Sequence, residues 1–290
     1  MPPFGVADPL APMFNTLRNW RKRAIESGSD RSQRSELERI GRAPRYTALT
    51  SNLFGFRFEL VDGASFCACY REIFEKEIYA FHTSNPTPLI LDCGANVGVS
   101  VVYFKRRFPA SRVIAFEADP RVFSVLQRNV AAARYDDVEL VNKAVWDADG
   151  EVDFWEQGAD AGRIMQQSDA NVSAHVRLST IRLRQYLTAP VEFLKLDIEG
   201  AETNVLRDCA DLLGNVRQLF VEYHSFAGEE QQLDLVIGLL KSAGFRVYVQ
   251  TAICSAQPFL QVSEYLGMDL QLNVFAIRPN SSASKHTVDG

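Results

Sequence analysis

An acidic residue and two glycines follow an apolar run about a third of the way along this 290-residue chain. The run Leu89–Leu91 ends in Asp92 and passes at once into Gly94-Ala95-Asn96-Val97-Gly98. This order predicts a buried strand, a tight turn and a helix start, where free backbone N–H groups favour a polar or anionic ligand. Glycine at 94 permits a turn that a Cβ would block, and Gly98 lets the helix start lie close to the strand or to a ligand.

A second apolar run, Arg112–Phe116, ends in Glu117. Rossmann-like folds use an acidic residue at this place to hold both hydroxyls of a ribose, so the two segments together predict a nucleoside-containing ligand. The dinucleotide pattern Gly-x-Gly-x-x-Gly is matched only at Gly94, since Asn96 and Val99 stand at its other glycine positions. The spelling Asp-x-Gly-x-Asn-x-Gly resembles instead the first motif of class I S-adenosylmethionine methyltransferases.

Further acids and a histidine follow two later strands. Asp197 and Glu199 come after the run 191–196, and Glu222 and His224 lie on one side of the strand 218–224 because strand side chains alternate. Ligands of open α/β sheets bind beyond the carboxyl ends of the strands, so these residues should face the same crevice as Gly94.

Residues of these types at one crevice could act as a general base, which removes a proton from a reacting group. Asp197, Glu199 and His224 are the candidates; histidine has the suitable intrinsic pKa, whereas a carboxylate needs burial or a like charge to raise its pKa. Each also has a structural alternative, such as a bond to a neighbour or a favourable place at a helix start. A Mg²⁺ ion held by Asp197, Glu222 and His224 is a weaker alternative, and a divalent metal is left open.

Strands and helices alternate from residue 89 onward, which predicts an α/β fold with a parallel sheet covered by helices on both faces. The expected strands are 89–93, 112–117, 138–142, 191–197, 218–224, 245–250 and 272–277, and the expected helices are 97–108, 120–133, 201–213 and 229–243. The segment 251–270 is expected to be an insertion that helps to shape the substrate pocket.

The segments outside this alternation are expected to be hairpins, a helix and a loop. One hairpin pairs 54–58 with 66–70, and a second pairs 143–146 with 151–155. A helix over 70–81 would let Tyr79 reach the cofactor, although a packed tyrosine is the alternative. The loop 156–176 is long enough for a lid or a disordered segment, and Arg163 and His175 are its candidate substrate contacts, although a solvated role is favoured for each.

Charge and composition predict a soluble globular protein. We expect an N-terminal extension over 1–50, a catalytic domain over 51–278 and a disordered tail over 279–290. Residues 18–45 hold nine Arg or Lys against four acidic residues, and the whole chain has a formal charge of −5. These basic residues could bind a membrane surface or an anionic substrate, but a solvated helical face is the favoured interpretation. The N-terminal helices themselves are expected to form an accessory cap or an arm of a homo-oligomer.

The same composition argues against several partners and compartments. The net acidity argues against nucleic acid. Neither a membrane span nor a secretory signal is visible. Five cysteines, odd in number and without zinc-site spacing, fit free thiols in a reducing cytoplasm.

Five motifs taken together resemble the FkbM family of S-adenosylmethionine-dependent methyltransferases over roughly residues 70–250. The motifs occupy 91–98, 115–120, 142–145, 193–202 and 220–224, and the run Lys-Leu-Asp-Ile-Glu-Gly-Ala-Glu is the most distinctive. The resemblance implies a Rossmann-like class I methyltransferase fold, a seven-stranded sheet whose last strand is antiparallel, and O-methylation of a small-molecule, sugar or secondary-metabolite hydroxyl. It also implies cofactor contacts, which lie at Asp92, Gly94, Ala95, Asn96, Gly98, Glu117 and Ala144.

Three other functions remain as alternatives at this point. An RNA or protein methyltransferase would use the same cofactor, and the acidity of the chain outside 18–45 speaks against RNA. An oxidoreductase or another nucleotide-binding Rossmann protein would need the missing glycines. A noncatalytic binding module would have no need of the acids at the strand ends.

Overall fold

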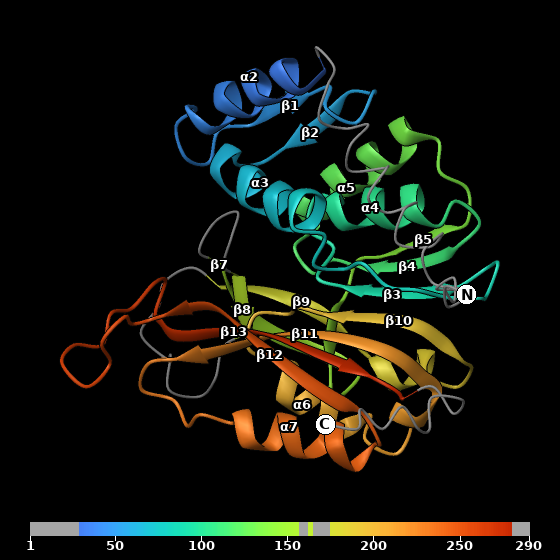
Figure 1. Cartoon of the computed structure of the whole chain (residues 1–290), viewed down its shortest axis with the longest axis vertical. Helices are drawn as coiled ribbons and strands as arrows, with labels where there is room; N and C mark the ends of the chain where they lie inside the picture. The colour runs from blue at the N-terminus through green and yellow to red at the C-terminus, as the bar shows by residue number, and fades with distance from the viewer. Residues whose placement is uncertain (1–28, 157–161, 165–174, 280–290) are drawn as a thin grey trace, which may run out of the picture.

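The computed structural model describes residues 29–156, 162–164 and 175–279, with a seven-stranded sheet at its centre (Figure 1). In spatial order the strands are β12 (Arg246–Cys254), β13 (Met268–Ile277), β11 (Val216–Phe226), β10 (Val191–Leu196), β3 (Leu89–Cys93), β4 (Arg112–Phe116) and β5 (Val138–Val141). Neighbours from β11 to β5 run parallel, whereas β13 is antiparallel to both of its neighbours. The predicted sheet, including its antiparallel last strand, is confirmed.

Helices cover both faces of this sheet, as expected for a Rossmann-like α/β fold. One face packs against α3 (Gly63–Tyr70), α4 (Val99–Arg107) and α5 (Pro120–Ala133), and the other packs against α6 (Glu202–Asp208) and α7 (Leu233–Ser242) (Figure 1). Strand side chains alternate between two hydrophobic clusters, so Ile90 belongs to the first and Leu91 to the second. Both faces are buried, which explains why these strands are almost continuously apolar.

Local sequence fixes where the helices beside β3 and β4 begin. Gly98 lies at the start of α4 with φ 97°, a left-handed conformation that glycine adopts without strain. Asp119 accepts the N–H of Arg121 and Pro120 occupies the first turn of α5, so the predicted helix 120–133 has the predicted bounds.

The predicted hairpin of 54–58 with 66–70 is wrong. The partner of β2 (Phe58–Leu60) is β1 (Leu49–Ser51), and Gly63–Tyr70 is α3. Asp62 caps this helix by accepting the N–H of Ser65, and the buried side chains recur at helical rather than strand spacing. Alternation over a short segment was therefore a misleading signal, because the cap decides the conformation.

The helix predicted over 70–81 is also wrong in its extent. Helical structure continues from α3 only through a π-helical turn, η1 (Arg71–Glu75), and Glu77 then takes a φ of 52°. Tyr79 follows the helix, and its buried ring contacts Phe104 and Phe220. It is packed in the core, although it also lines the cavity described below.

A second sheet corrects the other predicted hairpin. Its order is β6 (Ala144–Trp146), β9 (His175–Arg182), β7 (Gly150–Glu156) and β8 (Gly162–Ile164). The strand β9 therefore separates the two segments that were expected to pair, and η2 (Leu183–Tyr186) follows it. The side chains of Arg163 and His175, like residues 1–28 and 280–290, lie outside the described part of the chain.

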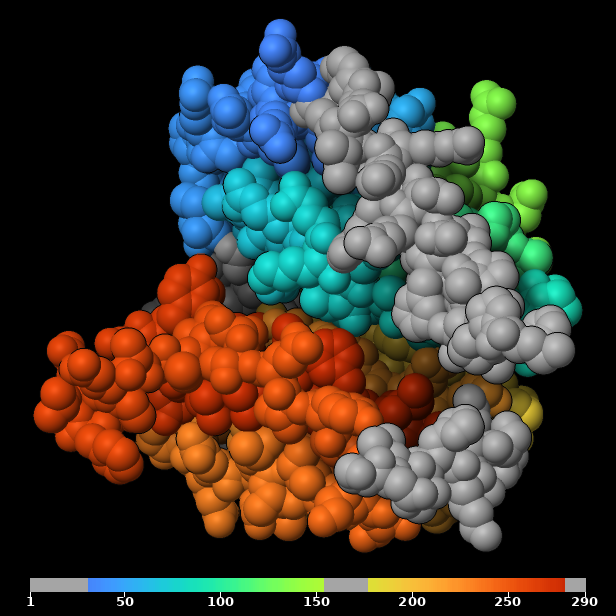
Figure 2. Space-filling view, in the orientation of Figure 1, coloured from blue at the N-terminus to red at the C-terminus, as the bar shows by residue number. Residues whose placement is uncertain are grey.

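The remaining elements differ from expectation in length. α6 ends at Asp208 instead of 213, and a 3-10 turn, η3 (Leu213–Asn215), precedes β11. The expected insertion is shorter, because β12 runs to Cys254 and β13 begins at Met268. The orange-to-red surface in Figure 2, which includes these strands and the segment between them, lies next to the blue-to-cyan surface of the N-terminal elements.

The N-terminal extension is described from α2 (Ser29–Gly41) onward. Leu37 and Ile40 of this helix are buried in the same hydrophobic cluster as α3 and α4. Across the described ranges, none of the helices combines the length and the apolar content needed to cross a membrane.

Candidate functional site

A cavity of about 530 Å³ lies where the predicted site residues meet, beyond the carboxyl ends of the parallel strands. Its volume is in the usual range for small-molecule sites. Of the predicted residues, its wall includes Gly94, Ala95, Asn96, Glu117, Ala144, Asp197, Glu199 and His224. Asp92 and Gly98 are not part of the wall: Asp92 lies fully buried, and Gly98 allows Leu126 of α5 to pack closely, 2.7 Å from where a Cβ would stand.

The glycine turn after β3 is built for close approach of two backbone segments. Gly94 has φ 83°, and a Cβ at this residue would stand 1.8 Å from the carbonyl oxygen of Asp197. The N–H groups of Gly94 and Ala95 both donate to the carbonyl of Phe116, at 3.0 and 2.8 Å. The turns that follow β3 and β10 therefore abut with no side chain between them.

Glu117 stands at the end of β4 with its carboxylate fixed by backbone groups. One oxygen accepts the N–H of Asn96 and the other accepts the N–H of Asp119, both at 2.9 Å. Burial raises the pKa of Glu117 to about 7, although these two hydrogen bonds act in the opposite direction. Each oxygen keeps a lone pair for a ligand hydroxyl.

We expect this shift to appear in the pH dependence of stability. The pKa of Glu117 is higher in the folded protein than its ordinary value of 4.5, so its stabilising effect is complete below about pH 4.5 and is lost as the pH rises through about 7. Replacing Glu117→Gln should reduce the loss of unfolding free energy between pH 5 and pH 8 by about 1 kcal/mol or more, measured by urea denaturation. An unchanged pH dependence would contradict the shift, and Glu139→Gln on the exposed edge of β5 is the control.

Lys195 is a site residue that sequence reasoning missed. Its ammonium lies 3.0 Å from an oxygen of Asp197 and 3.4 Å from one of Asp92, and it donates to the carbonyl of Gly94 at 2.7 Å. The side chain is buried. Burial lowers the pKa of Lys195, but the carboxylates of Asp197 and Asp92 raise it by more, so the ammonium group stays charged. A lysine inside an apolar strand was the signal that could have revealed it, because a buried lysine requires a partner.

Asp92, predicted to contact the cofactor, has a structural place below the turn. It accepts a hydrogen bond of 2.5 Å from the hydroxyl of Ser100 in α4, and it forms an ion pair with Lys195. It therefore connects β3, α4 and β10 beneath the glycine turn.

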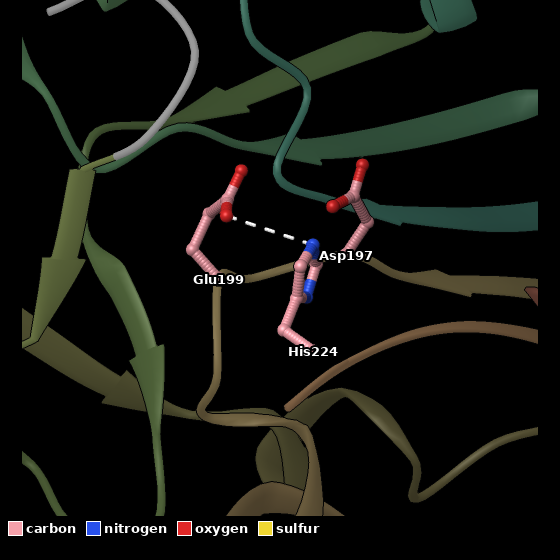
Figure 3. Close-up of side chains that lie close together, drawn as sticks. All are labelled: Asp197, Glu199 and His224. Atoms are coloured by element: carbon pink, nitrogen blue, oxygen red, sulfur yellow. Dashed lines mark ion pairs between the residues drawn. The ribbon is translucent and has the colours of Figure 1, made fainter. Parts of the chain in front are cut away.

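The predicted proton acceptors do come together. Asp197, Glu199 and His224 each offer one ligand atom within 4.8 Å of the others, and Figure 3 shows them pointing toward a common space. Nε2 of His224 lies 3.6 Å from a carboxylate oxygen of Glu199. The other ring nitrogen, Nδ1, lies 3.0 Å from Glu202, a buried residue whose role the sequence did not reveal.

Burial and the neighbouring charges shift the pKa values of this cluster. Burial lowers the pKa of His224, but the carboxylates of Glu199 and Glu202 raise it well above its ordinary value. Burial raises the pKa of both Glu199 and Glu222 to about 8. The role of His224 as proton acceptor stays a prediction.

The chain has the Rossmann-like class I fold, with a glycine turn after β3, an acid after β4 and polar residues after β10 and on β11 around one cavity. The chain belongs to the FkbM methyltransferase family, since the family model described as the methyltransferase FkbM domain matches residues 92–247, just over half of the chain. The resemblance inferred from the five motifs is confirmed.

Two curated relatives have names that state the acceptor position. The chain is 26% identical to the 2-O-methyltransferase NoeI of Sinorhizobium fredii, covering 54% of this chain and 72% of that protein. It is also 26% identical to the 31-O-demethyl-FK506 methyltransferase FkbM of Streptomyces tacrolimicus, covering 62% of this chain and 82% of that protein. Methyltransferase 1 of Beauveria bassiana is 29% identical to the chain, and the match covers 62% of this chain and 81% of that protein.

A solved structure shows a similar but distant chain. It is a methyltransferase FkbM from Methylobacillus flagellatus, with a TM-score of 0.44 and 15% identity. The match covers 67% of this chain and 45% of that chain.

Proposed function

We propose that the protein is an S-adenosylmethionine-dependent O-methyltransferase that acts on a hydroxyl of a small molecule, a sugar or a secondary metabolite. The observation that carries this proposal is one cavity whose wall includes the glycine turn and Glu117 together with Asp197, Glu199 and His224. Membership of a methyltransferase family and relatives named as O-methyltransferases support it.

The cavity residues at the glycine turn and after β4 fit S-adenosylmethionine. Glu117 presents two backbone-held oxygens, as two adjacent ribose hydroxyls require, and Ala144 is a buried small residue in the same wall. The same cavity wall includes the acidic residues Asp197, Glu199 and Glu222. When bound, S-adenosylmethionine supplies an electrophilic methyl group on its sulfonium.

The protein must hold the acceptor oxygen in line with the bond between the sulfur and the methyl carbon, and it must take the proton of the acceptor hydroxyl. Asp197 and Glu199 are partly exposed to the cavity, at 22% and 27%, and are therefore placed to accept it. His224 is held by Glu202 on its far side, which fixes the direction in which Nε2 points. The acceptor hydroxyl belongs in the space that these three side chains share.

Binding of S-adenosylhomocysteine tests the cofactor part of the proposal. Replacing Glu117→Ala should weaken this binding about tenfold or more in calorimetric titration, since hydrogen bonds to a charged group contribute about 1.5–3 kcal/mol each. Glu139→Ala, which also removes a carboxylate at the end of the sheet, should bind like the parent. If the folded parent protein does not bind S-adenosylhomocysteine, the proposal is wrong.

The cellular setting forms part of the same proposal. All five cysteines are free thiols, three of them buried, which supports a reducing compartment such as the cytoplasm. The formal charge of −5 argues against a nucleic-acid acceptor.

A further inference from the structure

We propose that Asp197, Glu199 and His224 bind one divalent metal ion. The three side chains come from two neighbouring segments, the turn after β10 and the strand β11, and their ligand atoms lie within 4.8 Å of one another (Figure 3). The role suggested for the ion rests on the proposed function, but binding of the ion does not, and it is measured separately.

His224 provides an observation that is independent of the acidic residues. Its side chain is 98% buried, since only 2% is exposed, and Nδ1 faces Glu202 at 3.0 Å. Among the described residues Nε2 has no hydrogen-bond partner, because the nearest carboxylate oxygen, on Glu199, is 3.6 Å away. Nε2 thus points at the cluster, ion-paired with Glu199 beyond hydrogen-bond distance.

The bond to Glu202 has the form seen behind metal-bound histidines, which donate the second ring N–H to a carboxylate and are thereby fixed in orientation. Glu202 is itself fixed, since its carboxylate accepts the N–H groups of Ile198 and Gly200 at 3.1 Å. The orientation of the ring therefore depends on backbone positions and not on side-chain rotamers alone.

The two carboxylates leave room for further ligands. Lys195 contacts one oxygen of Asp197 at 3.0 Å, which leaves the second oxygen for a metal. The side chains of Asp197 and Glu199 are 22% and 27% exposed toward the cavity, so the site is open on that side. An open site of this kind can accept water or a substrate oxygen.

The donor set indicates the class of ion. Two carboxylates and one imidazole, with no thiolate, suit Mn²⁺ or Mg²⁺ better than the soft ions that prefer sulfur. A divalent ion here would bind the acceptor hydroxyl, lower its pKa and orient its oxygen toward the methyl group. The proton would then leave to a cavity carboxylate or to water.

The test uses the full chain and Mn²⁺ alone, in the absence of cofactor and acceptor. The electron paramagnetic resonance signal of free Mn²⁺ should decrease as the ion binds, with a stoichiometry of one tightly bound ion per chain. Glu199→Gln should weaken this binding at least tenfold. Glu139→Gln removes the same charge far from the cluster and should leave binding unchanged. Electron spin-echo spectra of the bound Mn²⁺ should show nitrogen modulation that disappears in His224→Gln.

Several results would overturn the inference: no binding at millimolar Mn²⁺, equal loss in Glu139→Gln, or bound Mn²⁺ without nitrogen modulation in the parent protein. Glu199→Gln changes a partly exposed side chain, so it keeps the test valid if His224→Gln fails to fold. Titration with S-adenosylhomocysteine in the presence of a chelator separates the two proposals. Cofactor binding without Mn²⁺ binding removes only the metal, and the reverse result removes only the proposed function.

Discussion

Replacing Gly94→Ala is expected to abolish measurable cofactor binding and to destabilise the fold. The residue has φ 83°, and its new Cβ would stand 1.8 Å from the backbone oxygen of Asp197, so one of the two turns must move. A left-handed non-glycine residue alone costs about 1–3 kcal/mol, and the collision with rigid backbone adds to that cost. We expect at least about 3 kcal/mol of lost stability by urea denaturation and at least about a 100-fold weaker affinity for S-adenosylhomocysteine.

Gly238→Ala is the matched control for this substitution. Gly238 lies inside α7, where an added Cβ meets no atom within 4 Å. Alanine is favoured over glycine within a helix, so this variant should be about 0.5–1 kcal/mol more stable than the parent. Parent-like stability and affinity in Gly94→Ala would show that the turns are not in contact as described.

Replacing Lys195→Met is expected to destabilise the protein by about 3–5 kcal/mol, measured by urea denaturation at neutral pH. The ammonium lies between Asp92 and Asp197 and bonds to the carbonyl of Gly94, with only 2% of the side chain exposed. Methionine fills much of the volume but leaves two carboxylates without their cation. Removing one partner of a buried ion pair is costly because the remaining charge stays buried.

Two further variants separate this explanation from a loss of packing. Lys195→Met combined with Asp92→Asn should regain about 1 kcal/mol or more, because one uncompensated charge is gone. Arg112→Met breaks an exposed pair with Glu139 and should cost no more than about 1 kcal/mol. If the double variant is no more stable than Lys195→Met, charge compensation is not the function of the lysine.

The main sheet could be predicted from the sequence because its strands are buried on both faces and end in polar residues. β3, β4 and β10 are short apolar runs, each closed by an acid or a glycine turn, and such signals need no knowledge of distant partners. The cavity residues at those strand ends follow from the same rule, since parallel strands bring their carboxyl ends to one edge.

The errors arose where a distant contact or a cap decides the outcome. Phe66–Tyr70 alternates in sequence like a strand, but the carboxylate of Asp62 starts a helix there. The segment 147–150 has a turn signal that predicts a hairpin, but β9, further along the chain, takes the place between β6 and β7. No local pattern contains that information.

The site was incomplete for a similar reason. Asp197, Glu199 and His224 were found because chemistry requires their residue types, whereas Lys195 and Glu202 support them from below. Supporting residues are recognised by what they touch, and only the three-dimensional arrangement shows that Glu202 fixes the ring of His224 or that Lys195 joins two acids.

The place of β13 in the sheet determines the order in which the molecule can be completed during synthesis. It is the last strand in sequence, yet it lies between β11 and β12 and pairs Asn273 with Glu222 and Gln271 with His224. A nascent chain that lacks Met268–Ile277 therefore has an open, hydrogen-bonding edge along β11, where the acidic end of the cavity is still unfinished. Until that strand has been synthesised, the unpaired edge of β11 is a place where another chain can add a strand, which favours aggregation.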